Sequence, residues 1–205
     1  MRAIFLDEVG AMAIEMSDAV KDLILKARIV DVSRWRPSHP PESMVLFQAA
    51  DDERRYLTDE DFAEISRLAP KMTGLVPAAI VLRDQAKEIV DEARSKVLEQ
   101  YPGITEPGGR LFPAERGLAC WRDFWHFLRS IHYGIAGGRV EYTSQLGLHH
   151  MEALYKELLV PIDAMTSGLK YLKASSLVRL DAETGAIVGP YFDHLILHMD
   201  HFDED

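Results

Sequence analysis

The spacing of apolar residues predicts that helices make up almost the whole chain. Residues 4–32 place apolar side chains three or four positions apart with charges between them, which is the pattern of an amphipathic helix. The positions that carry the pattern are Val9, Met12, Met16, Val20, Leu23, Ala27 and Val30. Three prolines follow in residues 36–42, where they remove backbone donors and favour extended geometry. We therefore expect an N-terminal helix and a proline-rich linker.

Beyond the linker the same spacing predicts a series of helices, and no segment shows convincing strand alternation. Thr58 has the position of an N-cap, because three acidic residues fill the first turn after it. Prolines and glycines between residues 101 and 113 mark a loop. The expected helices are 43–50, 58–69, 77–100, 114–137, 144–158, 161–175 and 183–201. The pattern predicts an all-α fold.

The charge balance excludes several classes of function. The 205 residues include 23 Lys and Arg against 33 Asp and Glu, and the net charge of −10 repels phosphate backbones and anionic headgroups. No stretch approaches the roughly 20 apolar residues of a membrane span, and no basic leader precedes an apolar core. No phosphate loop, nucleophile elbow or zinc-helix motif occurs. We expect an intracellular protein that is not an enzyme, does not bind nucleic acid and does not span a membrane.

The single cysteine, Cys120, is the main candidate for chemistry. A step of 100° per residue places Cys120, Asp123, Phe124 and Phe127 on one face of its predicted helix. The other side carries residue types enriched at protein interfaces, namely Arg122, Trp125, Arg129 and Tyr133. A lone cysteine is more often an inert core residue than a ligand. A carboxylate on the same apolar face, however, requires hydrogen-bond donors, so both interpretations stay open.

Four parts of the sequence carry the motifs of a known family. Residues 120–138 contain Cys-x-Arg-Asp, then Leu-Arg, a tyrosine and a small-residue stop. Residues 50–58 read Ala-Asp-Asp-Glu-Arg-Arg-Tyr-Leu-Thr, residues 106–109 read Glu-Pro-Gly-Gly, and further matches lie in the C-terminal third, at 151–164 and 189–193. Together they resemble the phycobiliprotein family, most closely its allophycocyanin α type, over roughly residues 43–202. Several motifs in the correct order and spacing are a specific signal.

The resemblance implies a globin-like helical domain over residues 42–205 that begins with a helical hairpin, preceded by an extension over residues 1–41. It implies a light-harvesting or energy-transfer subunit whose open-chain, phycocyanobilin-like tetrapyrrole is held by a thioether to Cys120. Asp123 would accept hydrogen bonds from the pyrrole N–H groups, and Arg122 would pair with a propionate. The remaining positions implied for the pigment site are Phe127 and Arg110.

The resemblance also implies a subunit partner. In the family, five of the matching positions join the α and β subunits, and here they are Asp51, Arg55, Tyr56, Arg129 and Tyr133. We therefore expect docking with a β-type subunit or self-association, with other phycobilisome components as possible partners. The implied location is peripheral, on the cytoplasmic side of the thylakoid membrane.

Departures from the family pattern keep other interpretations open. His126 and Phe127 stand where two tyrosines are usual, and Ala119 stands where a basic residue often grips a propionate. A pigment-free regulatory relative, or a haem protein that uses His126 or His132, is therefore an alternative. The extension is either an extra packed helix or a cover for an assembly surface. Five other histidines have spacings that weakly suggest metal binding, but a solvent-exposed C-terminal helix with scattered histidines is the better explanation. They are His149, His150, His194, His198 and His201.

Overall fold

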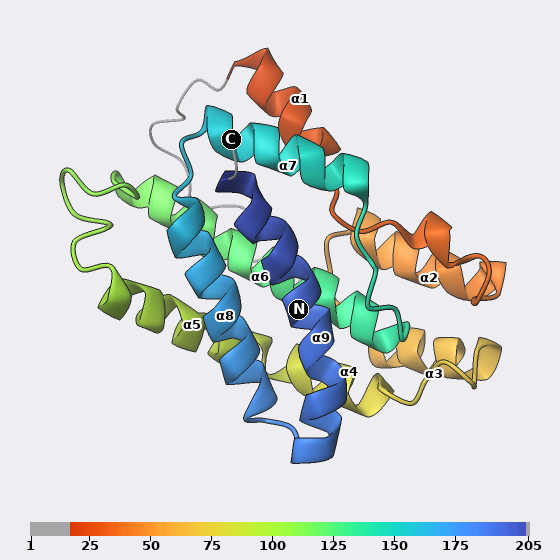
Figure 1. Cartoon of the computed structure of the whole chain (residues 1–205). Coiled ribbons are helices and arrows are strands. Elements are labelled where there is room, and N and C mark those ends of the chain that lie inside the picture. The colour runs from red at the N-terminus through yellow and green to blue at the C-terminus, as the bar shows by residue number, and fades with distance from the viewer. Residues whose placement is uncertain (1–16, 204–205) are drawn as a thin grey trace.

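The computed structural model describes residues 17–203, and helices make up nearly all of its regular structure (Figure 1). The α-helices are α1 (Asp18–Lys26), α2 (Pro41–Asp52), α3 (Asp59–Leu68), α4 (Val76–Asp84), α5 (Ala86–Gln100), α6 (Ala114–Ala136), α7 (Gln145–Glu157), α8 (Ile162–Leu177) and α9 (Ala182–Asp200), with short 3₁₀ turns η1 (Val32–Trp35) and η2 (His201–Asp203). Within the described residues, β-type pairing is limited to one bridge between Val30 and Thr143. The all-α prediction is confirmed.

Local signals placed several helices correctly. Thr58 caps α3 as expected: Asp61 N donates to Thr58 Oγ1 at 3.2 Å, and Thr58 N donates to Asp61 Oδ2 at 2.8 Å. This reciprocal capping box satisfies two backbone donors that the first turn would otherwise leave unpaired. The helices predicted at 114–137, 144–158, 161–175 and 183–201 correspond to α6 through α9.

The predicted N-terminal helix differs from the observed one. Part of the range 4–32 falls on residues 1–16, which lie outside the described residues, and α1 ends at Lys26. After α1 the backbone pairs with a distant segment, since Asp31 N donates to Tyr142 O at 3.0 Å. Tertiary pairing therefore replaces the helical hydrogen bonds that the apolar spacing predicted.

The long helix predicted over 77–100 is divided in two. Gln85 has φ −108° and ψ 15°, outside the helical range, and it separates α4 from α5. The two helices have different neighbours, because α4 packs against α6 whereas α5 packs against both α6 and α8. The change of direction lets both apolar faces reach the core, which one straight helix would not allow.

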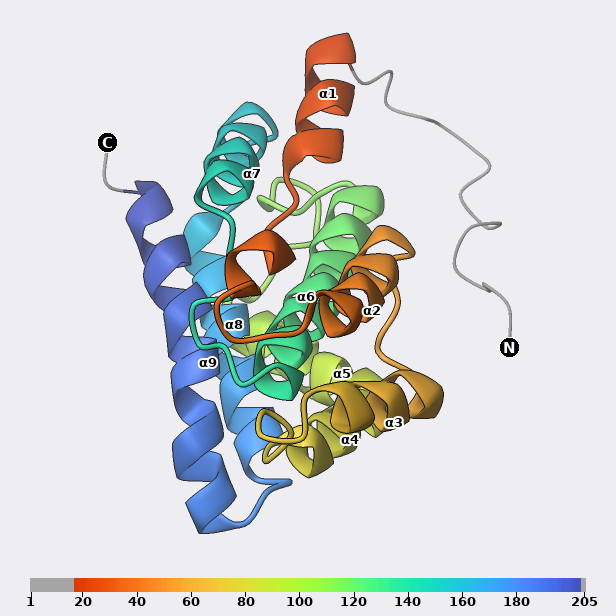
Figure 2. The same ribbon diagram turned by 90° about the vertical axis from the view of Figure 1, so that its right-hand side faces the viewer.

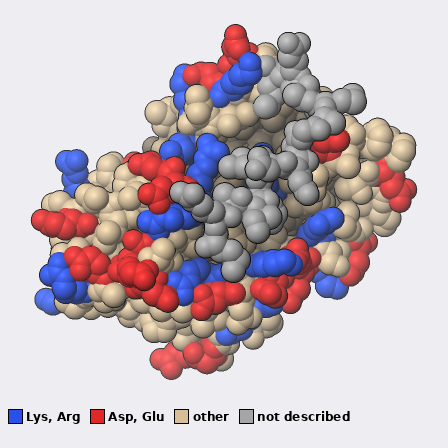
Figure 3. All heavy atoms as spheres, turned by 180° about the vertical axis from the view of Figure 1, so that it is seen from behind, with Lys and Arg blue, Asp and Glu red and all other residues tan. Residues whose placement is uncertain are grey.

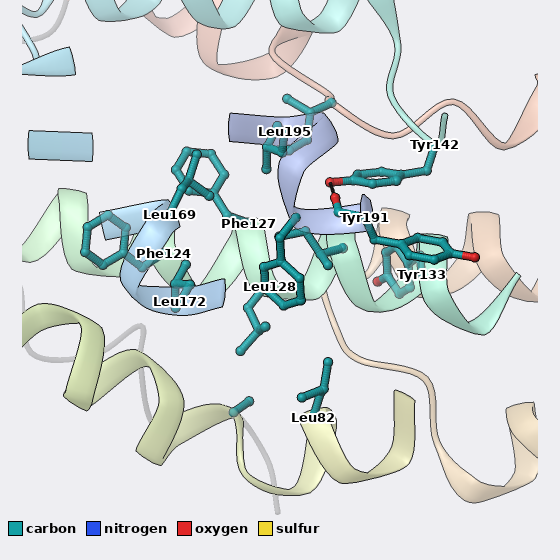
Figure 4. Packing of buried hydrophobic residues seen from close by; sticks show 14 of the residues in the cluster. Leu82, Phe124, Phe127, Leu128, Tyr133, Tyr142, Leu169, Leu172, Tyr191 and Leu195 are labelled. Atoms are coloured by element: carbon teal, nitrogen blue, oxygen red, sulfur yellow. Dashed lines mark hydrogen bonds between the residues drawn. The ribbon is translucent and has the colours of Figure 1, made fainter. Parts of the chain in front are cut away.

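Helix α6 runs through the middle of the molecule (Figures 1 and 2). It packs against α4, α5, α8 and α9. Phe124 and Leu128 of α6 are fully buried, beside Leu169 of α8 and Leu82 of α4 (Figure 4). Gly168 permits this contact, since a Cβ there would lie 2.0 Å from the Phe124 ring. At about 1.5–3 kcal/mol for each buried large side chain, this packing fixes the helix that carries Cys120.

The described part of the N-terminal extension packs into the same core. Trp35 of η1 is fully buried, and its ring centroid lies 4.9 Å from that of Phe47 in α2. Helix α1 lies beside α7 (Figure 2). The approach is close, because a Cβ on Gly147 would lie 1.7 Å from the Arg28 carbonyl oxygen. The division into residues 1–41 and 42–205 stays a prediction.

Candidate functional site

Cys120 is a buried thiol near the start of α6. Its side chain is 4% exposed and belongs to the hydrophobic core. Burial, reinforced by the negative charge of Asp123, raises the pKa of the Cys120 thiol to about 12. At neutral pH the thiol therefore keeps its proton, and without assistance it is a weak nucleophile.

Asp123 lies one turn further along α6 and has an unusual environment for a carboxylate. Tyr155 of α7 donates its hydroxyl hydrogen to Asp123 Oδ2 at 2.9 Å, whereas Oδ1 accepts no hydrogen bond from any residue between 17 and 203. Burial raises the pKa of Asp123 to about 6, although the Tyr155 bond and the Arg122 charge oppose the shift. Asp123 is half-buried, and its second oxygen could accept from a ligand that brings N–H donors, because a carboxylate forms charge-assisted hydrogen bonds with such groups.

Tyr155 was not among the site residues predicted from the sequence. Its sequence signal was the stretch 151–156, which contributed to the family resemblance without indicating a role for the tyrosine. The contact joins residues 32 positions apart on two different helices, so only the folded structure reveals it.

The three other residues predicted for the pigment site, Phe127, Arg122 and Arg110, have surroundings that differ from one another. Phe127 is 2% exposed and forms part of the core near Leu195 of α9 (Figure 4). Arg122 is exposed, and its guanidinium makes no hydrogen bond or ion pair within the described part of the chain. Arg110 donates to both oxygens of Asp163, at 2.6 and 2.7 Å. The guanidinium of Arg110 is thus already paired with the Asp163 carboxylate. Its assignment to the pigment stays a prediction.

Other groups hold the start of α6 in place. Arg116 donates to the carbonyl oxygens of Leu158 and Leu159 at 2.9 Å each, so it caps the C-terminal end of α7. The Arg94 guanidinium of α5 lies 5.6 Å from the ring centroid of Trp121. These contacts link α5, α6 and α7 around Cys120.

The five residues predicted for subunit contact are brought together by the fold. Arg129 Nη1 donates to Asp51 Oδ1 and to the Tyr133 hydroxyl, both at 2.8 Å, and Tyr133 donates to the Arg55 carbonyl oxygen. Tyr56 donates to a backbone carbonyl of α6 at 3.3 Å. The sequence placed Arg129 and Tyr133 on a face of α6 rich in residue types enriched at interfaces, but both are buried within the chain. Their expected role at an interface stays a prediction.

Some histidines are engaged in packing and hydrogen bonds, whereas Nδ1 of His126 is buried and finds no hydrogen-bond partner among the described residues. His132 is fully buried, its Nδ1 lies 3.1 Å from the Ala79 carbonyl oxygen, and its Nε2 accepts from Leu57 N at 3.4 Å. Both ring nitrogens are therefore occupied, which disfavours haem ligation by His132. The expected solvent-exposed C-terminal helix is wrong: α9 buries one face in the core, and His194 lies 2.8 Å from the Thr143 hydroxyl. Among the described residues no cluster suited to a metal ion occurs.

Charged side chains of both signs are interspersed over the rear face of the molecule (Figure 3). This distribution differs from the one-sided basic stripe typical of nucleic-acid binding. In the described part of the chain no helix is both long enough and apolar enough to cross a membrane.

Comparison with known proteins gives the class. The family model described as "Phycobilisome protein" matches residues 45–199. The chain is 35% identical to "Allophycocyanin subunit alpha-B" of Nostoc sp. over 77% of its own length and 97% of that relative. It is 31% identical to "Allophycocyanin alpha-B chain" of Porphyra purpurea over 73% and 93%, and 32% identical to "Allophycocyanin alpha chain" of Mastigocladus laminosus over 71% and 91%.

The chain belongs to the phycobilisome protein family, whose phycobiliproteins are structural proteins of light harvesting. Within that family it is an allophycocyanin α-like light-harvesting subunit. Phycobiliproteins carry covalently bound bilins, assemble as α–β heterodimers within phycobilisomes, and lie in general at the thylakoid surface. The family prediction is confirmed.

Proposed function

We propose that this subunit carries one phycocyanobilin-like open-chain tetrapyrrole, joined by a thioether to Cys120. The observation that supports the proposal is the pairing of Cys120 with Asp123 on α6. The thiol is the chain's single cysteine, and the neighbouring carboxylate is half-buried, with one oxygen that accepts no hydrogen bond from the described residues. The pigment, when bound, supplies the absorption of red light.

The Cys120 thiol would add across the exocyclic carbon–carbon double bond of the pigment. A sulfur–carbon bond forms, and the thiol proton is balanced by a proton gained at the adjacent carbon, so no oxidant is needed. With the pKa of the thiol at about 12, the reactive thiolate is scarce near pH 7, and unassisted attachment is expected to be slow.

Asp123 would accept hydrogen bonds from the central pyrrole N–H groups. Charge-assisted hydrogen bonds are about twice as strong as neutral ones, so the carboxylate would hold the pigment protonated and extended. Arg122 has a guanidinium without a partner in the described residues and would pair with a propionate. Phe127 would support this face of α6 from within the core.

The group of Asp51, Arg55, Tyr56, Arg129 and Tyr133 would form the docking surface for a β-type subunit. Its support is the connected network that joins the end of α2 and the loop after it to α6. The assembled subunit would lie on the cytoplasmic side of the thylakoid membrane.

Co-expression with phycocyanobilin and its attachment enzymes tests the pigment proposal. We expect a coloured protein whose band still fluoresces with zinc after denaturing electrophoresis, because a thioether survives unfolding. Colour that is lost on denaturation would exclude covalent attachment, and a protein without colour would favour the pigment-free alternative.

Replacing Tyr155 by phenylalanine is expected to raise the pKa of Asp123 above about 6 in the pigment-free protein. The substitution removes the one donor that opposes the effect of burial. Because the folded-state pKa is raised above 3.8, the unaltered protein loses stability as pH rises through about 4 to 6, and Tyr155→Phe extends that loss to higher pH. Carbon-detected NMR titration of the carboxyl group measures the pKa. Tyr171→Phe, which removes a hydroxyl bonded to Gln100, is the control, and an unchanged Asp123 pKa in Tyr155→Phe would contradict the assignment.

A further inference from the structure

Helix α2 carries a site for a guanidinium group, and the N-terminal extension fills it. Arg28 Nε donates to Asp51 Oδ2 at 3.1 Å, while its Nη2 donates to the same oxygen and to Asp52 Oδ1 at 2.8 Å. Two adjacent carboxylates thus share one planar cation, a geometry that suits arginine better than lysine. The other oxygen of Asp51 accepts from Arg129 at 2.8 Å.

These charged groups form an inner and an outer layer. The side chains of Asp51 and Arg129 are 5% and 8% exposed, whereas that of Arg28 is 38% exposed. Arg28 therefore covers the inner ion pair on the solvent side. A cation that arrives from outside would reach Asp51 only at the position that Arg28 occupies.

The backbone around Arg28 is fixed on both sides. Before it, α1 lies on α7, and after it, Ser144 N donates to Ile29 O at 2.8 Å and the Trp35 side chain is fully buried. These contacts do not depend on the Arg28 guanidinium. The side chain could therefore leave the two carboxylates while the segment that carries it stays in place.

We propose that Arg28 occupies, within its own chain, a guanidinium site that an arginine of a β-type subunit would otherwise fill, so that the extension competes with subunit docking. The proposal rests on the docking surface proposed above and is independent of pigment attachment. A partner must displace the hydrogen bonds that Arg28 makes to Asp51 and Asp52. The extension thereby lowers the affinity of the docking surface for that partner.

Titration with a purified allophycocyanin β subunit tests the competition. We expect Arg28→Ala to bind the β subunit about tenfold more tightly than the unaltered chain does, equivalent to about 1.4 kcal/mol. Arg28→Lys keeps the charge but loses the two-pronged geometry, so its affinity should lie between the two. Lys26→Ala removes one positive charge from the same extension, where Lys26 pairs with Asp22, and should bind like the unaltered chain.

The outcomes separate this inference from the docking surface on which it rests. If the unaltered chain binds and Arg28→Ala binds equally or less tightly, the competition is wrong and the docking surface stands. If neither binds the β subunit, the docking surface itself is wrong, and the competition falls with it. Thermal melting of Arg28→Ala establishes whether the variant is folded. If it is not folded, the affinity of Arg28→Lys for the β subunit tests the competition, and it should exceed that of the unaltered chain.

Discussion

Replacing Cys120 by alanine is expected to abolish covalent pigment completely. The chain has one cysteine, so no second thiol could take over the attachment. The fold should survive, because removing one sulfur atom from a core of this size costs about 1 kcal/mol. After co-expression with phycocyanobilin, the variant should give no zinc-fluorescent band on a denaturing gel, whatever pigment it retains in its native state.

A variant on the same helix provides the control for this result. Leu118 is 57% exposed, and Leu118→Ala alters α6 two residues before the thiol without touching the core. It should keep the zinc-fluorescent band. A band of unchanged intensity in Cys120→Ala would contradict the attachment site.

Asp123→Asn is expected to leave the pigment attached but to weaken its red absorption strongly. Asparagine has nearly the same shape but no negative charge, and neutral hydrogen bonds are about half as strong as charge-assisted ones. The pigment should then lose its proton near neutral pH, and its red absorbance should fall strongly. Native and acid-denatured spectra of the same sample separate this effect from a lower pigment content.

The matched control for Asp123→Asn is Asp193→Asn. Asp193 is an exposed carboxylate of α9 that pairs with Lys173 at 2.6 Å. Its loss should leave the native spectrum unchanged. If Asp123→Asn also keeps the spectrum of the unaltered protein, the proposed role of the carboxylate is wrong.

Features of the fold that depend on neighbouring residues could be predicted from the sequence. The cap at Thr58 and the extent of α6 are examples, since both follow from residues within one or two helical turns. The break at Gln85 could not be predicted, because it follows from α4 and α5 having different packing partners. Likewise, the extended path of the chain after α1 is fixed by a distant contact, the hydrogen bond from Asp31 N to Tyr142 O.

The candidate site was predictable to the same degree. The helical spacing of Cys120 and Asp123 placed both on one face of α6, where the structure has them. The contact of Asp123 with Tyr155 and the contact of Arg129 with Asp51 span 32 and 78 residues. Contacts of that separation depend on how the helices pack. The sequence alone therefore indicated neither the Tyr155 hydroxyl as a donor to Asp123 nor the burial of Arg129 and Asp51.

Mass spectrometry of tryptic peptides from the coloured, co-expressed protein tests the central claim most directly. Cleavage after Arg116 and Arg122 releases a peptide of residues 117–122 that contains Cys120. The proposal predicts that this peptide carries the added mass of one bilin and absorbs visible light. An unmodified 117–122 peptide from protein that keeps its colour through denaturation, or bilin mass on any other peptide, would contradict the claim.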